Sequence, residues 1–587
     1  MIRRRFFFHQ RKEVNSQKRI SFVGFVFIIF FLVLVSRLFS LQIKQYSDFA
    51  KQAETIHETT AVLAPDRGLI YCHDKNNTQT PLAINKKYYT LYAVPKEIHD
   101  PQKISQELSQ LIPLSYDEIY SHLNKPDDPY ELLLKKINDD ALINKIKEVK
   151  LEGIYITSEN YRYYPLGSPA SQTVGFVAES DDGKIKGRYG LELYYDEILS
   201  GESGVFQGVR DAFGRLIRSV LSQEKQVKEG ADIVTTLDKN IQFSAETILQ
   251  ELVVKRQATQ GSLIVMEAKT GKILALANYP TFDPNEFNKI KDYSVFRNYA
   301  VEDRYEPGSI IKSLTMAAGL DLELVYPTTT YTDIGYFEVG GYKLVNYDNE
   351  VYGKNTTMTR VLERSINTGG IFVGQKLGLE NLRKYFKAFG LNQKTGIDLP
   401  NEITGDLSNL EYPKANPTYL ATASYGSGIA ITPLELLKAY SAISNKGLMV
   451  TPYLVEALRD NNSTINTGAI AEPQRVISEK TAETLSSMLV SVVENGFGIN
   501  TKIKGYSTGG KTGTAFISLP NGKGYSEDMI HTYIGYFPAS DPQFLILVKM
   551  DRPLATSDSA SHTVTLAFKQ MEQFLINYYN VPPDENL

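Results

Sequence analysis

The chain has 587 residues, so two or more domains are expected, because one hydrophobic core does not grow to that length. A net charge of −4 and a charged fraction of 22% give no support for a nucleic-acid partner. A single cysteine, Cys72, excludes an intramolecular disulfide framework and any CxxC motif, and the seven histidines show no metal-ligand spacing. We therefore expect no metal and no cofactor.

The first predicted element is a membrane-spanning helix. An unbroken apolar run from Phe22 to Val35 lies within Ile20–Leu41, which has about the length that crosses a bilayer as a helix. No small-x-small cleavage site follows, so an uncleaved anchor is favoured over a cleaved signal peptide. Basic residues crowd the first twenty positions and predict an N-terminus in the cytoplasm, with everything after about residue 44 outside.

The exported part is predicted to begin with a non-catalytic module. Residues 44–228 mix short β-rich runs, such as Tyr88–Val94, with charged stretches expected to be helical, such as Tyr130–Val149. No compact set of catalytic residue types occurs there. The predicted order is therefore a cytoplasmic tail over 1–19, an anchor over 20–43, a structural or docking pedestal over 44–228 and a catalytic domain over 229–587.

The catalytic domain opens with clear local signals. Asp232–Asp238 is predicted to be a strand that ends in a helix cap, and Ile241–Lys255 follows with helical periodicity. Ser262–Glu267 and Lys272–Ala277 are apolar strands joined by a hairpin turn. With helices in the middle and strands near the end, this pattern predicts an α/β domain with a mainly antiparallel sheet.

Ser309 is the candidate nucleophile. Pro307 and Gly308 precede a helical pattern, which places Ser309 at a helix N-terminus where developing negative charge is favoured. Lys312 is one turn further on, so its amine lies on the same face as the Ser309 hydroxyl and, when desolvated, can act as a neutral base. One SxxK motif is weak evidence, since Ser222–Lys225 also fits in a charged stretch.

The second element is Ser365-Ile366-Asn367, which follows a helical stretch over Met358–Arg364. Its hydroxyl can relay a proton between the base and a leaving amine, and its amide can hold a substrate carbonyl. Ser158–Asn160 matches the same short pattern but falls in the pedestal.

The third element is Gly509–Thr514, read as a strand that continues through Ser518. Its glycines let a substrate backbone lie close, and Lys511, Thr512 and Thr514 offer a cation and hydroxyls to a carboxylate. Two other KTG triplets are dismissed: Lys269–Gly271 is a hairpin turn and Lys394–Gly396 lacks the flanking glycines.

The ordered set SxxK, SxN and KTG is the signature of penicillin-binding proteins and class A β-lactamases. Over nearly its whole length the chain resembles class B penicillin-binding proteins, the monofunctional peptidoglycan D,D-transpeptidases. Ser424–Leu434 resembles the division (septal) type more than the elongation type. The other matching segments are Arg37–Gln42, Pro65–Gly68, Gly187–Glu192, Thr235–Asp238 and Tyr305–Ser309.

The resemblance implies a fold and a mechanism. The fold is a penicillin-binding/serine β-lactamase-like transpeptidase domain, an antiparallel sheet flanked by helices, after an elongated α+β pedestal and one transmembrane helix. Ser309 would attack the D-Ala-D-Ala bond of a stem peptide, and an amine of a neighbouring stem would resolve the acyl-enzyme. The implied catalytic residues are Ser309, Lys312, Ser365, Asn367 and Lys511, the implied substrate-binding residues are Thr512, Gly513 and Thr514, and the backbone N–H groups of Ser309 and Thr514 would form the oxyanion hole.

The same resemblance implies partners and a location. The partners are peptidoglycan stem peptides, β-lactams as inhibitors, the membrane through one helix, a polytopic glycan polymerase and division-complex proteins, with no nucleic acid. The protein is expected in the cytoplasmic membrane as a single-pass chain, with its catalytic domain periplasmic or extracytoplasmic.

Other protein classes share parts of this pattern. Gly505–Thr512 fits the Walker A pattern letter for letter, but a strand follows where a P-loop needs a helix. A β-lactamase is disfavoured because the chain has no Glu-x-x-Leu-Asn segment between Ser365 and Lys511 to position a deacylating water. A catalytic triad with His531 or His562 is disfavoured because no GxSxG elbow is present, so His531 is predicted to be structural. An elongation-type transpeptidase, a D,D-carboxypeptidase and a non-enzymatic β-lactam-binding scaffold stay open.

Overall fold

The computed structural model describes residues 16–47, 58–210, 216–217, 224–460, 463–467, 471–519, 524–554 and 559–584. They fall into two compact units, one made of Met1–Pro65 with Glu202–Lys228 and the other of Asp66–Gly201 with Glu229–Leu587. The predicted boundary at residue 228 stays a prediction.

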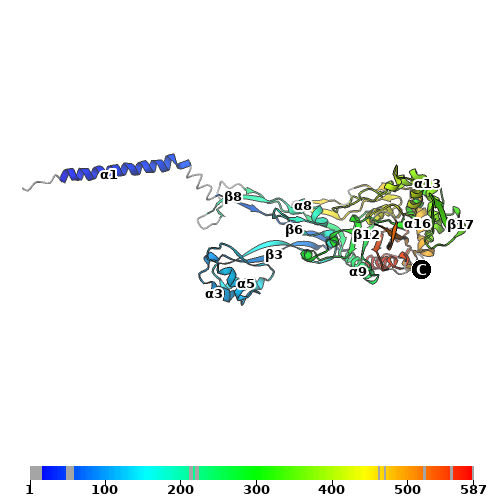
Figure 1. Cartoon of the computed structure of the whole chain (residues 1–587), viewed down its shortest axis with the longest axis horizontal. Coiled ribbons are helices and arrows are strands. Elements are labelled where there is room, and N and C mark those ends of the chain that lie inside the picture. The colour runs from blue at the N-terminus through cyan, green and yellow to red at the C-terminus, as the bar shows by residue number, and fades with distance from the viewer. Residues whose placement is uncertain are drawn as a thin grey trace, which may run out of the picture. The chain divides into compact units, whose positions relative to one another are not determined.

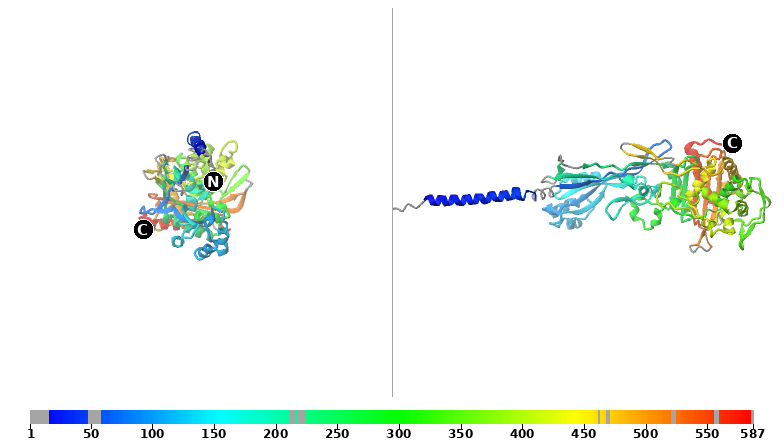
Figure 2. Two further views of the ribbon diagram at one scale, coloured as in Figure 1. Left: turned by 90° about the vertical axis from the view of Figure 1, so that its left-hand side faces the viewer. Right: turned by 90° about the horizontal axis from the view of Figure 1, so that it is seen from above.

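The first unit carries the apolar helix. α1 spans Ser16–Phe39 and continues as a π-helical turn over Ser40–Lys44, seen as the dark blue helix of Figure 2. The stretch Ile20–Lys44 has 25 residues and contains an 18-residue window with a mean hydropathy of 2.7, so it is long and apolar enough to cross a membrane. The strands of this unit are antiparallel: β1 (Glu58–Leu63), β8 (Gly204–Arg210), β9 (Leu216–Ile217) and β10 (Glu224–Lys225).

The second unit opens with a seven-stranded sheet in the order β20-β19-β11-β2-β3-β4, with β5 also paired to β3. Only β11 and β2 run parallel among the pairs of this sheet that the structure describes. Its strands are β2 (Ile70–His73), β3 (Thr80–Ala93), β4 (Glu131–Ile137), β5 (Ile154–Tyr163), β11 (Asp232–Asp238), β19 (Val455–Arg459) and β20 (Thr464–Asn466). The helices α3 (Pro101–Leu108), α4 (Tyr116–Leu123) and α5 (Asp140–Val149) form a small core with β3 and β4, beside the end of β3 in Figure 1.

One expectation for this region is wrong. Tyr130–Val149 was expected to be helical throughout, but its first half is strand β4 and only Asp140–Val149 is helix. β4 pairs antiparallel with β3 and buries Leu133 and Ile137 in the small core. Three consecutive leucines fit either period, so the tertiary pairing decides the conformation.

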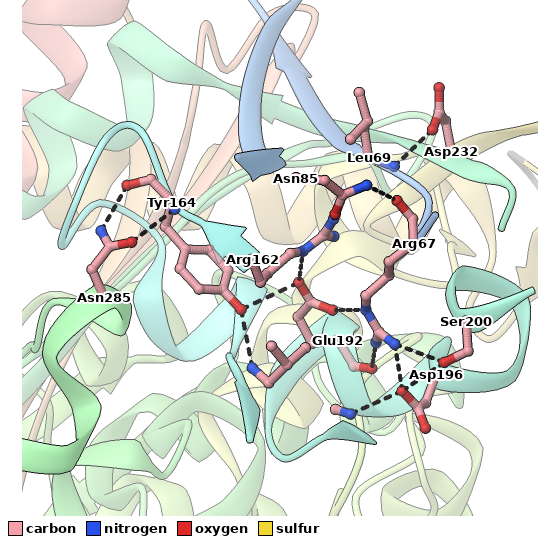
Figure 3. A network of polar contacts seen from close by, with 12 residues as sticks. Arg67, Leu69, Asn85, Arg162, Tyr164, Glu192, Asp196, Ser200, Asp232 and Asn285 are labelled. Carbon is pink, nitrogen blue, oxygen red and sulfur yellow. Dashed lines mark hydrogen bonds and ion pairs between the residues drawn. The ribbon is translucent and has the colours of Figure 1, made fainter. Parts of the chain in front are cut away.

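A buried polar network joins two segments that resembled the family. Glu192 is fully buried and binds Arg67 Nε at 2.7 Å and Arg162 Nε at 2.6 Å, as Figure 3 shows. Arg67 also pairs with Asp196 at 2.8 Å, and Tyr164 donates its hydroxyl to Glu192 at 3.3 Å. One carboxylate therefore holds the loop before β2 and the end of β5 together.

Replacing Glu192 by glutamine is expected to lower the free energy of unfolding by about 3–5 kcal/mol, because it leaves the buried Arg162 guanidinium without its counter-charge and leaves Arg67 paired with Asp196 alone. Denaturant unfolding of the exported part would measure this. The control is Glu152→Gln, which breaks an exposed pair with His99 and should change stability little. Equal losses in the two variants would contradict the assignment.

The catalytic half is built on a five-stranded antiparallel sheet in the order β13-β12-β24-β23-β22. Its strands are β12 (Gln260–Glu267), β13 (Ile273–Tyr279), β22 (Gly509–Ser518), β23 (Tyr525–Phe537) and β24 (Phe544–Asp551). The strand at Asp232–Asp238, the hairpin of β12 and β13 and the antiparallel sheet are as predicted. Asp238 caps helix α9 by accepting the N–H groups of Asn240 and Ile241.

Helices cover both faces of this sheet. α9 (Lys239–Lys255) and α17 (Val564–Tyr579) pack on one face, on which Val265 and Val548 lie. On the other, with Ile264 and Leu547, lie α11 (Ile311–Asp321), α13 (Asn367–Ala388), α15 (Pro433–Ser444) and α16 (Glu479–Asn495). The alternation of neighbours between the two cores follows from the two-residue period of a strand.

Shorter elements complete the second unit. The helical ones are η2 (Pro95–Glu97), α6 (Ser171–Val174), α7 (Gly190–Tyr194), α8 (Asp196–Ser200), η3 (Pro284–Lys289), η4 (Tyr293–Phe296), α10 (Tyr299–Glu302), η5 (Gly308–Ile310), α12 (Met358–Glu363), η6 (Ser408–Leu410), α14 (Pro417–Ala423), η7 (Ile499–Thr501) and η8 (Ala560–His562). The strands are β6 (Val177–Glu179), β7 (Ile185–Gly187), β14 (Thr330–Asp333), β15 (Tyr336–Val339), β16 (Tyr342–Val345), β17 (Gly353–Thr357), β18 (Leu448–Met449) and β21 (Gln474–Arg475).

Candidate active site

Ser309 lies in the short helix η5, which runs directly into the buried helix α11. Gly308 before it has φ +58°, and a Cβ there would stand 2.8 Å from the carbonyl oxygen of Thr514. Its N–H donates to the carbonyl of Gly426 at 3.1 Å. Glycine at this position thus lets the nucleophile turn pack against strand β22, which brings the backbone of Ser309 close to that of Thr514.

Lys312 reaches Ser309 as the motif predicted. Its side chain is almost fully buried, with Nζ 2.7 Å from Ser309 Oγ. Nζ also donates to the carbonyl oxygen of Ser365 at 2.6 Å and to Oδ1 of Asn367 at 2.7 Å. Ser309 and Asn367 are themselves half-buried, so this constellation borders solvent.

The chemistry of these contacts favours a neutral amine. Burial first, and then the charge of Lys511, hold the pKa of Lys312 well below its ordinary value, and Asp348 acts weakly in the opposite direction. A neutral amine has two hydrogens and one lone pair. The carbonyl oxygen of Ser365 and Oδ1 of Asn367 can only accept, so they take both hydrogens of the amine. The lone pair is then left facing the Ser309 hydroxyl.

Ser365 lies in the sharp turn between α12 and α13. Its φ of +54° is a left-handed conformation that is uncommon for serine and that concentrates at functional sites. Its Oγ lies 3.3 Å from Lys312 Nζ and 2.9 Å from Lys511 Nζ. The hydroxyl therefore bridges the two lysines, as a proton relay requires.

Strand β22 supplies the third element. Lys511 is fully buried, and it donates to Ser365 Oγ and, at 3.1 Å, to the Thr512 carbonyl. Burial lowers the pKa of Lys511 to about 7. Lys511 Nζ lies 2.9 Å from Ser365 Oγ and 3.5 Å from Thr512 Oγ1, so both hydroxyls lie within reach of its charge.

Gly513 and Thr514 form the wall next to Ser309. A Cβ on Gly513 would stand 2.6 Å from the carbonyl oxygen of Pro307, so only glycine fits there. Thr514 is half-buried, and its Oγ1 accepts the N–H of Ala560 at 3.4 Å. The structure thus brings all eight predicted site residues together, on η5, α11, the turn before α13, the first residue of α13 and β22.

The competing motifs lie elsewhere. Ser158–Asn160 is on β5, and Asn160 binds Asp66 there. Lys269–Gly271 is the turn between β12 and β13, while Ser222 lies outside the described residues. Gly509–Thr512 is extended strand rather than a phosphate-binding loop before a helix.

His531, predicted to be structural, is buried on β23 opposite Thr514, where it contacts Thr563 Oγ1 at 2.9 Å.

Comparisons with known proteins match this arrangement. Residues 261–571 match the family model described as penicillin binding protein transpeptidase domain, and residues 62–235 match that of the penicillin-binding protein dimerisation domain. The chain is 33% identical to stage V sporulation protein D of Bacillus subtilis over 550 residues, which cover 93% of this chain and 83% of that protein. It belongs to the penicillin-binding protein transpeptidase family.

Further relatives agree. A probable peptidoglycan D,D-transpeptidase PenA of Neisseria meningitidis is 30% identical over 585 residues, which cover 98% of this chain and 95% of that protein. The crystal structure of penicillin binding protein 3 from Mycobacterium tuberculosis with aztreonam superposes with a TM-score of 0.69 at 26% identity and covers 89% of this chain and 98% of that chain. At the level of the family, the predicted fold and the predicted peptidoglycan D,D-transpeptidase that binds β-lactams are confirmed. The N-terminal apolar helix fits a single-pass membrane anchor.

Two contacts at the transpeptidase site were not predicted from the sequence. Tyr425 has its ring centre 6.0 Å from Lys312 Nζ. Glu306 accepts hydrogen bonds from Ser518 Oγ at 3.1 Å and from the Tyr525 hydroxyl at 3.0 Å, which ties the nucleophile turn to β22 and β23. Ser424–Leu434 served only as a subfamily marker in the sequence, and no local signal there shows that its tyrosine reaches the lysine.

Proposed function

We propose that this protein is a serine D,D-transpeptidase that cross-links peptidoglycan stem peptides through an acyl-enzyme on Ser309. The observation that carries the proposal is the position of the Lys312 amine. It lies 2.7 Å from Ser309 Oγ, and two oxygens that can only accept, the Ser365 carbonyl oxygen and Asn367 Oδ1, lie 2.6 and 2.7 Å from it. A serine needs such a base within hydrogen-bond reach to act as a nucleophile.

In the acylation step Lys312 takes the Ser309 proton while Oγ attacks the carbonyl of the penultimate D-Ala. The backbone N–H groups of Ser309 and Thr514 stabilise the oxyanion. The peptide C–N bond then breaks, and the leaving D-Ala amine receives a proton from Lys312 through the bridging hydroxyl of Ser365.

In the second step an amine of a neighbouring stem attacks the ester carbonyl. Its proton passes to Lys312 and then to the departing Ser309 oxygen, so a new amide forms and the enzyme returns to its first state. Asn367 would hold the donor peptide, and Thr512 and Thr514 would receive its terminal carboxylate under the charge of Lys511. The extended edge beside Gly513 lets the peptide backbone lie close.

We further propose a septal role, supported by the resemblance of Ser424–Leu434 to division-type members. The basic N-terminal tail supports a catalytic domain outside the cytoplasmic membrane, and residues 44–228 would serve as the pedestal on which a glycan polymerase and division proteins dock. A fluorescent fusion at mid-cell throughout constriction would support this role, and an even lateral distribution would favour the elongation type.

Full-length protein in detergent, supplied with glycan strands whose stems end in D-Ala-D-Ala, tests the reaction. Wild type is expected to release D-Ala and to form cross-linked dimers, and Ser309→Ala is expected to form none. Release of D-Ala without dimers would instead show a carboxypeptidase. Binding of substrate and penicillin without any product would instead indicate a non-enzymatic scaffold.

The pH profile of acylation by a penicillin should be bell-shaped. The reaction needs Lys312 neutral, and it needs Lys511 charged to attract the drug carboxylate, so the alkaline limb should have its midpoint at about 7 in the free enzyme. The second-order acylation rate against pH measures this. Lys511→Arg keeps the charge to much higher pH and should remove the limb, whereas a limb that survives in this variant would contradict the assignment.

A further inference from the structure

Behind Asn367 lies a polar hub made of Tyr331, Asp333, Asn346 and Thr368. Asp333 ends β14 and Asn346 follows β16, and both side chains are 1% exposed. Thr368 directly follows Asn367 at the start of α13 and is also buried. The hub thus joins two short two-stranded sheets to the helix that begins with a predicted catalytic residue.

Asp333 is the common acceptor of this hub. Its carboxylate accepts from Thr368 Oγ1 at 2.6 Å, Asn346 Nδ2 at 3.1 Å, the N–H of Tyr352 at 2.7 Å and the N–H of Gly335 at 3.1 Å. An ionised carboxylate can only accept, so it fixes which end of each neighbour faces it.

The direction set by Asp333 passes to Asn346 and Thr368. With Nδ2 turned to Asp333, the Oδ1 of Asn346 accepts the backbone N–H of Thr368 at 3.2 Å. Thr368 spends its hydroxyl hydrogen on Asp333, so its oxygen accepts from the Tyr331 hydroxyl at 2.9 Å. The end of β16 and the start of α13 are therefore held together through one oriented amide.

A second chain of hydrogen bonds begins at that junction. The Val345 carbonyl, next to Asn346, accepts Nδ2 of Asn367 at 2.9 Å. This contact turns Oδ1 of Asn367 toward Lys312, which donates to it at 2.7 Å. Because Lys312 spends a hydrogen there, its lone pair stays directed at Ser309.

We propose that Asp333 is a positioning residue for acylation. Through Asn346 it holds the Val345 carbonyl in place, that carbonyl fixes the orientation of the Asn367 amide, and the amide keeps the Lys312 lone pair on Ser309. The inference rests on the proposed function of Ser309 and Lys312, and it assigns the segment between β14 and β17 a part in setting the direction of proton transfer.

The variant Asp333→Asn keeps the shape of the side chain but turns an N–H₂ group toward the donors that Asp333 accepts. Asn346 then loses its fixed orientation, which releases the Val345 carbonyl and lets the Asn367 amide turn. A turned amide presents hydrogens to Lys312. That disfavours the ammonium form and draws the lone pair away from Ser309. The expected result is a fall of at least about 10-fold in the plateau acylation rate, with drug affinity nearly unchanged.

The pH profile separates this effect from simple loss of folded protein. Disfavouring the ammonium form lowers the pKa of Lys312, so the acid limb should move to lower pH in Asp333→Asn. Partial unfolding would lower the amplitude and leave the midpoint in place. Lys511 on β22 and Asp348 after β16 are the charged groups that act on Lys312, and both stay in the variant.

The experiment measures penicillin acylation against pH on the full chain for wild type, Asp333→Asn and Thr368→Val, which removes one donor to Asp333 with little change in shape. The control is Asp398→Asn. Asp398 is also buried, and it accepts the N–H groups of Leu454 and Val455 and the Tyr195 hydroxyl away from Lys312.

A lower plateau with an acid-shifted limb in Asp333→Asn, and an unmoved limb in Thr368→Val and Asp398→Asn, would support the proposal, because Asn346 keeps both of its partners in Thr368→Val. An unmoved limb in Asp333→Asn, or a normal plateau rate per folded molecule, would overturn it. A wild type that forms no adduct would overturn the proposed function as well, which keeps the two failures distinct.

Discussion

Replacing Lys312 by methionine is expected to lower the acylation rate by a penicillin about 10³-fold, because the variant loses the only base within hydrogen-bond reach of Ser309 among the described residues. Methionine has nearly the same length and suits a buried position, so the site should keep its shape. Stopped-flow or quenched acylation kinetics would measure the loss.

The same variant is expected to be more stable than the wild type. The pKa of Lys312 is depressed in the folded state, so at neutral pH the unfolded chain binds one proton more, and lysine costs stability below its ordinary pKa. Methionine removes that cost, so Tm should rise as activity falls. The control Lys438→Met removes a lysine that is only partly buried and donates to the Thr395 carbonyl, and it should keep the wild-type rate. Comparable rate losses in the two variants would contradict the role of Lys312.

The second large effect is expected for Gly308→Ala. A Cβ at this position stands 2.8 Å from the Thr514 carbonyl oxygen, on a residue with φ +58°. The nucleophile turn must then move away from β22, and a shift of about 1 Å in a reacting group costs on the order of 10²-fold in rate. The measurement is the acylation rate together with the free energy of unfolding.

Gly378→Ala separates the two causes of that effect. Gly378 has φ +71°, but a Cβ there meets nothing within 4 Å. Its ψ is 167°, so alanine there should lose only the about 1–3 kcal/mol that this glycine-favouring backbone conformation costs another residue, and should keep the wild-type rate. If Gly308→Ala acylated as fast as Gly378→Ala, the close approach of the turn to β22 would have no part in catalysis.

Local signals carried much of the fold of the catalytic half. The Asp238 cap, the helix after it and the hairpin of β12 and β13 each follow from a few neighbouring residues, and the structure has all of them. The order of SxxK, SxN and KTG likewise predicts a site around Ser309, and the structure brings these residues into contact. These features need only short-range spacing or a shared motif.

What the sequence did not show depends on contacts between distant segments. The leucines of strand β4 fit the helical period and the strand period equally well. Only pairing with β3 decides between the two, and that pairing cannot be read from the local sequence. The low pKa of Lys511 follows from its complete burial in the folded domain. The proposed positioning role of Asp333 depends on its contacts with Thr368 and with the backbone of Tyr352, which lie in other segments of the chain. No residue near Asp333 in the sequence indicates that its carboxylate is oriented toward the start of α13.

The central claim is that Ser309 forms a covalent acyl-enzyme. Intact-mass measurement of wild type and Ser309→Ala after incubation with a penicillin tests it most directly, with peptide mapping to locate the adduct. The account predicts one stable drug-sized adduct on the peptide containing Ser309, absent from the alanine variant. No adduct on folded wild type, or an equal adduct on the variant, would contradict it.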